Sequence, residues 1–148
     1  MGMRRSLCLV ALAGIAISSS ALPSSTDWSY SGGDAGGMRY TTAAEITPGN
    51  VNRLVPVWTY RTGHMQAPED AFERSKFEVT PILVEDKLVL CTPFNVIIAL
   101  DPASGAELWR HDPKINMEQR PANGYACRGV AYWRDLQAPP DAKCAARI

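Results

Sequence analysis

The sequence predicts an all-β fold made of short antiparallel strands joined by tight turns. Eleven glycines and eleven prolines among 148 residues favour turns and strands over long helices. Hydrophobic residues make up 46% of the chain and charged residues 20%, which is ordinary composition for a folded domain. Runs of β-forming residues alternate with turn residues most densely at 78–110, and we expect the core of the fold there.

The charge pattern excludes several classes of function. Lysine plus arginine total 15 and aspartate plus glutamate total 15, so the formal net charge is zero. No basic patch supports nucleic-acid binding. The sequence also lacks the HExxH, Walker and GxGxxG patterns that would indicate a zinc protease, a nucleotide-phosphate loop or a dinucleotide fold.

Residues 1–21 resemble an export signal. Two arginines are followed by an apolar run of 11 residues, Leu7 to Ile17, and by a small-residue stretch that ends at Ala21. Spanning a bilayer takes about 20 apolar residues, so this run is too short. We expect cleavage near Ala21, with residues 22–148 as the exported part; the alternative is a buried N-terminal helix.

Three cysteines follow this segment, namely Cys91, Cys127 and Cys144. An odd number in an exported protein allows one disulfide and one free thiol. Cys127 and Cys144 are 17 positions apart and flank a proline-containing loop, so they are the preferred pair. Two unpaired buried thiols remain an equal alternative, because sequence does not fix connectivity.

The segments before residue 78 are expected to contain a loop, a short helix, a strand and a surface excursion. Glycine-rich residues 27–38 predict a loop, and Thr47-Pro48 predicts the start of a short helix that ends at Asn52 or Leu54. Residues 55–60 predict a strand. The polar residues 64–76 predict a surface excursion.

The sequence of residues 78–110 predicts four strands, at 79–84, 87–92, 96–100 and 106–110. The tight turn at 101–105 has an aspartate to cap the backbone, a proline to preset φ and a glycine to supply positive φ. Such a meander, with Trp109 on its outermost strand, makes one propeller blade or one sheet of a sandwich. A further strand starts at Val130, and an apolar strand begins as the chain stops, so the sequence predicts a truncated chain.

Residues 99–109 resemble the tryptophan-docking motif of quinoprotein propellers, because Ala99, Gly105 and Trp109 occupy its first, seventh and eleventh positions. Further segments are similar to pyrroloquinoline quinone (PQQ)-dependent dehydrogenases of the glucose and quinate branch. They are Ile-Thr-Pro-Gly-Asn-Val at 46–51, Glu-Val-Thr-Pro at 78–81, Cys-Thr-Pro at 91–93 and Cys-Arg-Gly-Val at 127–130. The resemblance implies a partial eight-bladed β-propeller, about one blade with flanking strands.

The resemblance also implies two cofactor-binding residues. Glu78 matches the glutamate near the PQQ carboxylates, and Arg128 matches the arginine that pairs with carboxylate and quinone oxygens. A planar guanidinium suits a cofactor with three carboxylates and an ortho-quinone. Without the resemblance, Glu78 is a surface carboxylate at a strand start and Arg128 is a surface cation beside a turn. The catalytic aspartate, the Ca²⁺ ligands and a PQQ-binding lysine are expected outside this chain.

Two departures from the family pattern stand out. Ala126 precedes Cys127, so the disulfide between adjacent cysteines that stacks on PQQ in alcohol-oxidising relatives is absent. Gly124 stands where the glucose-type branch has a histidine. The neighbouring Tyr125 offers a substitute stacking face.

The resemblance implies the N-terminal fragment of a periplasmic dehydrogenase, inactive alone, that oxidises a sugar or polyol and passes electrons to ubiquinone or a cytochrome. Peripheral membrane association is left open. The alternative is a non-enzymatic scaffold with the same docking motifs, as in outer-membrane assembly factors, which lack Glu-Val-Thr-Pro and Cys-Arg-Gly. A truncated, inactive remnant is a third interpretation.

Overall fold

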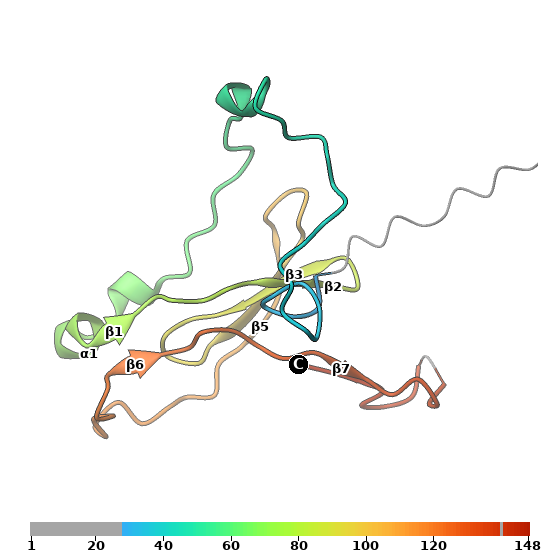
Figure 1. The fold of residues 1–148 in the computed structure, drawn as a ribbon. Helices are drawn as coiled ribbons and strands as arrows, with labels where there is room; N and C mark the ends of the chain where they lie inside the picture. Colours follow the sequence, from blue (N-terminus) through green and yellow to red (C-terminus); the bar gives the residue numbers. More distant parts are fainter. Residues whose placement is uncertain (1–27, 140) are drawn as a thin grey trace, which may run out of the picture.

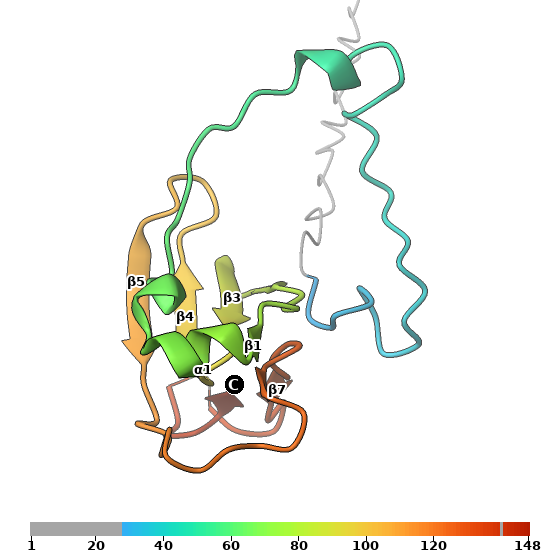
Figure 2. The ribbon, with the colours of Figure 1, turned by 90° about the vertical axis from the view of Figure 1, so that its left-hand side faces the viewer.

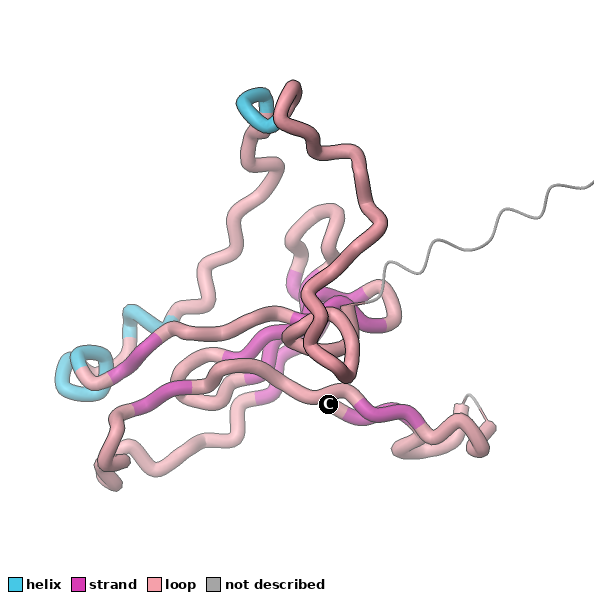
Figure 3. Tube along the Cα trace, in the orientation of Figure 1, coloured by secondary structure: helices cyan, strands magenta, loops and turns pink. Residues whose placement is uncertain are grey.

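The computed structural model describes residues 28–139 and 141–148. The expected export signal at 1–21 lies outside the described residues. Strands carry the regular structure of the described part, and its helices are single short turns (Figure 3). No helix within the described ranges is long and apolar enough to cross a membrane.

A four-stranded antiparallel sheet forms the centre of the fold, as predicted (Figure 1). Its strands follow one another in sequence order, so the sheet is a meander: β2 Ile82–Val84, β3 Lys87–Cys91, β4 Ile97–Leu100 and β5 Glu107–His111. Trp109 lies on the outermost strand, opposite Ala99. The predicted core of the fold at 78–110 is therefore confirmed.

The turns of this sheet follow from local chemistry. Glu85 and Asp86 join β2 to β3, and both have positive φ, as the two-residue hairpin turn of type I′ requires. Between β4 and β5, Oδ1 of Asp101 accepts hydrogen bonds from the backbone N–H of Ala103 at 3.1 Å and of Ser104 at 2.7 Å. The aspartate thus caps the predicted turn.

The inner strands β3 and β4 are covered on both faces of the sheet, whereas every residue of β5 is exposed. Alternate side chains of a strand point to opposite faces, so Ile98 and Leu100 belong to one hydrophobic cluster while Ala99 belongs to the other. Tyr132 packs against the Ala99 side, and Trp58 packs against the Leu100 side. The continuous apolar run of β4 is explained by this burial on both faces.

The chain at 55–60 covers one face through its side chains. The Trp58 indole N–H donates to the carbonyl of Pro102 at 3.1 Å, and the ring lies so close to Gly105 that a Cβ there would be 2.5 Å from it. The Tyr60 hydroxyl bonds Glu107 and accepts from Arg110 at 2.8 Å. The prediction of a strand at 55–60 is wrong, because side chains rather than backbone groups join this segment to the sheet.

Between Trp28, which forms a backbone bridge with Leu83 of β2, and Trp58, the chain leaves the sheet as a long excursion (Figure 2). The helix predicted from Thr47 is reduced to a turn and the 3₁₀ helix η1, Val51–Arg53. Asn50 rather than Thr47 precedes it, and the Asn50 side chain accepts from the backbone N–H of Thr47 at 2.7 Å. Large apolar side chains of this excursion are exposed, among them Met38, Tyr40, Ile46, Val55 and Val57.

The segment at 64–76 is more than a surface excursion. It forms the 3₁₀ helix η2, His64–Gln66, the helix α1, Glu69–Glu73, and the strand β1, Ser75–Lys76. Ala71 of α1 is buried against Phe94 and Tyr125, which makes a second small core. The polar composition of residues 64–76 did not predict this core, because the segment contributes few apolar residues to it.

Two further strand pairs complete the fold. β1 pairs in parallel with β6, Tyr125–Ala126, and β7, Trp133–Arg134, pairs antiparallel with β8, Ala146–Arg147. The strand predicted from Val130 begins three residues later, because Val130 and Tyr132 pack their side chains against the sheet before β7 starts. The predicted strand near the end of the sequence is present as β8.

Candidate functional site

The two predicted site residues lie side by side. Ser75 pairs with Tyr125 and Lys76 with Ala126 in the parallel β1–β6 ladder, so the segments that follow both strands run together. The backbone N–H of Thr80 donates to the carbonyl of Arg128 at 2.9 Å and continues this alignment. As a result, Nε of Arg128 lies 3.0 Å from Oε2 of Glu78, although the two residues are 50 positions apart.

The Glu78–Arg128 pair borders a cavity of about 430 Å³. Its lining consists of polar or small side chains from the two segments: Lys76, Glu78, Asn123, Gly124, Ala126 and Arg128. Sequence reasoning missed Lys76 and Asn123. The signal for Lys76 was its position two residues before Glu78, because extended backbone places such residues on the same face.

The ion pair is open to solvent. The Arg128 side chain is 83% exposed and the Glu78 side chain 42% exposed. Such a pair is worth only about 0–1 kcal/mol, so it adds little to the stability of the fold. Only Nε of Arg128 is engaged, and within residues 28–139 and 141–148 the structure gives its two terminal nitrogens no protein partner. Lys76 and Arg128 outnumber the single carboxylate, so the cavity suits an anion.

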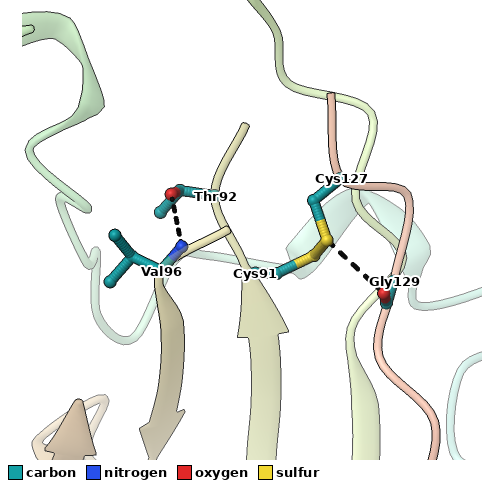
Figure 4. The surroundings of a disulfide bond; sticks show 5 residues. All are labelled: Cys91, Thr92, Val96, Cys127 and Gly129. Atoms are coloured by element: carbon teal, nitrogen blue, oxygen red, sulfur yellow. Dashed lines mark hydrogen bonds between the residues drawn. A yellow bond between two sulfur atoms is a disulfide. The ribbon is translucent and has the colours of Figure 1, made fainter. Parts of the chain in front are cut away.

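A disulfide joins Cys91 to Cys127, next to Arg128 (Figure 4). The two Cα atoms are 6.0 Å apart, and Cys144 is free and exposed. The preferred pair Cys127–Cys144 was therefore wrong, as was the alternative of unpaired thiols at both positions. Cys127 directly follows β6, and the fold brings it to the last residue of β3, 36 positions away in sequence.

Tyr125 is not a stacking face for a ligand. Its side chain is buried, its ring lies 5.4 Å from that of Phe94, and its single hydroxyl proton is shared between the carbonyls of Met117 and Gln119, which lie 2.9 and 3.0 Å from the oxygen. The prediction of a substitute stacking surface is wrong because the aromatic ring fills the second core.

Gly124 has a structural reason to replace a histidine. Its φ is +76°, and a Cβ atom there would lie 2.2 Å from the carbonyl oxygen of Arg74. No side chain fits this position with the backbone as it stands. The β1–β6 alignment therefore uses glycine for close backbone approach.

The remaining ionic clusters lie away from this cavity. The hydrogen bond from Tyr132 lowers the pKa of Glu85, and hydrogen bonds from Arg110 and then Tyr60 lower the pKa of Glu107. Among the described residues, no group of three or more histidine, cysteine, aspartate or glutamate side chains is arranged to hold a metal ion. The cavity beside Glu78 and Arg128 thus offers cationic and amide donors rather than metal ligands.

Residues 28–148 match the family described as glucose/ethanol/alcohol dehydrogenase, beta-propeller domain, of the PQQ type. The chain belongs to this family, and its sheet is part of a PQQ β-propeller.

Individual relatives agree with this assignment. The chain is 40% identical over 129 residues to the glycerol dehydrogenase large subunit of Gluconobacter oxydans. These residues make up 87% of the chain and 17% of that relative. It is 40% identical over 106 residues to the quinoprotein glucose dehydrogenase of Escherichia coli, covering 72% of the chain and 13% of the relative. The quinate/shikimate dehydrogenase (quinone) of Acinetobacter baylyi is 35% identical over 111 residues, which make up 75% of the chain and 13% of that relative. The chain thus spans 13 to 17% of the length of these relatives.

Proposed function

We propose that this chain supplies part of the PQQ site of a periplasmic dehydrogenase that oxidises a sugar or a polyol. One observation carries the proposal: the structure brings Glu78 and Arg128 together at a cavity that Lys76 and Asn123 also line. Relatives named glycerol dehydrogenase and quinoprotein glucose dehydrogenase support this substrate class, since both names refer to molecules with several hydroxyl groups.

The donor set fits the cofactor. PQQ carries three carboxylates and an ortho-quinone, so its site needs cations and hydrogen-bond donors. Arg128 has its terminal nitrogens available, Lys76 adds an ammonium group, and Asn123 adds an amide. A guanidinium fork binds two oxygens at once, and this is the strongest arrangement that a single side chain offers to a carboxylate.

Glu78 and Arg128 have distinct roles in the proposed site. Glu78 accepts from Nε of Arg128 and so fixes the direction of the guanidinium. Arg128 anchors the cofactor and stabilises negative charge that develops beside it. The chemistry that PQQ supplies when bound is acceptance of two electrons from the hydroxyl-bearing carbon of the substrate. Removal of the hydroxyl proton and binding of Ca²⁺ are assigned to residues outside this chain.

The electron acceptor and the location of the enzyme rest on the names of relatives and on the sequence. The names of two relatives specify a quinone and a cytochrome c, so we propose ubiquinone or a cytochrome as the electron acceptor. The export signal predicted from the sequence at 1–21 supports a periplasmic location, where peripheral contact with the membrane would bring the enzyme close to ubiquinone.

A PQQ titration of the full-length apoprotein at fixed Ca²⁺ tests this function. Replacing Arg128 with lysine keeps the charge but removes the fork, and losing one charge-assisted contact costs about 1.5–3 kcal/mol, or roughly tenfold to 150-fold in affinity. The matched control is Arg120→Lys, because Arg120 is exposed, lies 3.8 Å from Asp70 and does not line the cavity. Equal affinities of the wild type and Arg128→Lys would contradict the assignment of the site.

A further inference from the structure

The disulfide ends beside the proposed cofactor arginine. Cys127 directly precedes Arg128, and its partner Cys91 is the last residue of β3, with only 1% of its surface exposed (Figure 4). Two hydrogen bonds between Thr92 and Val96 close the turn after Cys91. The Thr92 N–H donates to the Val96 carbonyl at 2.9 Å, and the Val96 N–H donates to Oγ1 of Thr92 at 3.3 Å. Cys91 is therefore a fixed point of the sheet.

Few other contacts hold Arg128 itself, although Val130 and Tyr132 farther along the loop pack their side chains against the sheet. The strand β6 ends at Ala126, and residues 127–132 carry no regular structure. Among the described residues, the backbone of Arg128 is held by one hydrogen bond, from the N–H of Thr80 to its carbonyl at 2.9 Å. Its side chain is 83% exposed and bonds Glu78 alone. The disulfide is the covalent link between this loop and the core.

We propose that the Cys91–Cys127 disulfide positions Arg128 for the cofactor, and this inference rests on the proposed function. Binding groups work best when they are held within about 0.5 Å of their productive geometry, and a loop that must be ordered on binding loses affinity. The disulfide restrains Cys127 at a Cα distance of 6.0 Å from the sheet, so the guanidinium starts from a defined place beside Glu78. An oxidising compartment keeps such a bond formed.

The test compares PQQ affinity in the full-length apoprotein with and without the disulfide. The double variant Cys91→Ala/Cys127→Ser removes both sulfurs, and we expect its affinity for PQQ to fall about tenfold, because the backbone of one residue, Arg128, must then be ordered on binding. Cys144→Ser is the matched control, because Cys144 is an exposed free thiol, and its affinity should equal that of the wild type.

A double-mutant cycle separates positioning from general damage. If the disulfide acts through Arg128, removing it in an Arg128→Ala background should change PQQ affinity less than twofold. A tenfold loss that persists in that background would overturn the proposal, as would equal affinities of the double variant and the wild type. Should the double variant fail to fold, Cys91→Val/Cys127→Ala fills the core position with an apolar side chain, and the same cycle applies. Absence of PQQ binding by the wild type would contradict the proposed function itself, and this inference with it.

Discussion

Replacing Gly105 with alanine tests the contact that fastens residues 55–60 to the sheet. Gly105 has a φ of +71°, and the left-handed region costs an L-residue with a Cβ roughly 1–2 kcal/mol. The new Cβ would lie 2.5 Å from Cδ2 and Cε3 of Trp58, so the ring must move away. The hydrogen bond from its indole to Pro102, now 3.1 Å, is then lost at a cost of about 0.5–1.5 kcal/mol. We expect a total loss of about 2–3 kcal/mol in local stability.

Hydrogen–deuterium exchange with mass spectrometry measures this effect in the full-length protein. Local opening sets the exchange rate of protected amides, so a loss of about 2–3 kcal/mol should speed exchange roughly 30-fold to 150-fold in peptides that cover residues 97–111. The control is Gly49→Ala, where the nearest atom to a new Cβ is Oγ1 of Thr47 at 3.8 Å and φ is not positive. Unchanged exchange in Gly105→Ala would refute the reasoning.

Three further predictions concern the cavity and the ionic clusters. Lys76→Gln should weaken PQQ binding up to about fivefold and reduce its salt dependence, as loss of an exposed charge does, and an unchanged titration would exclude Lys76 from the site. Gly124→His should destabilise the protein by more than about 2 kcal/mol, measured as a lower thermal midpoint, because its Cβ would overlap the carbonyl of Arg74; an unchanged midpoint would contradict this. The pKa of Glu107 is lowered mainly by the hydrogen bond from Arg110, so its contribution to stability is present above the ordinary glutamate pKa and is lost as pH falls through the lower folded value. Glu107→Gln should therefore show a smaller fall in thermal midpoint between neutral and acidic pH than the wild type, and parallel profiles would argue against it.

The sheet could be predicted because its signals are local. The apolar runs of β2 to β5 and the turns at Glu85-Asp86 and at Asp101 each lie within a few residues of sequence, and the predicted strands agree with the structure to within three residues. The β4 strand was identifiable from its uninterrupted apolar run, which its burial on both faces explains.

Long-range contacts explain the errors. Residues 55–60 have the composition of a strand, but Trp58 and Tyr60 contribute side chains to the sheet instead. The pairing of Cys91 with Cys127 depends on the fold bringing the residue after β6 to the end of β3, and no spacing rule gives it. The burial of Tyr125 depends on the second core, to which Ala71 contributes.

The candidate site was accessible only through resemblance. Glu78 and Arg128 each read as ordinary surface charges in sequence, and nothing local indicates that they meet. Their contact follows from the parallel pairing of β1 and β6, two strands of two residues each, which are too short to leave a periodic pattern. Lys76 was missed as well, because its alternation with Glu78 becomes informative only once Glu78 is placed in the site.

The most direct test of the central claim is a structure of the full-length protein with PQQ bound. The account predicts terminal nitrogens of Arg128 within hydrogen-bond distance, about 2.7–3.2 Å, of carboxylate or quinone oxygens of the cofactor, while Glu78 keeps its contact with Nε. A structure with the cofactor bound elsewhere and Arg128 paired with Glu78 alone would contradict the account.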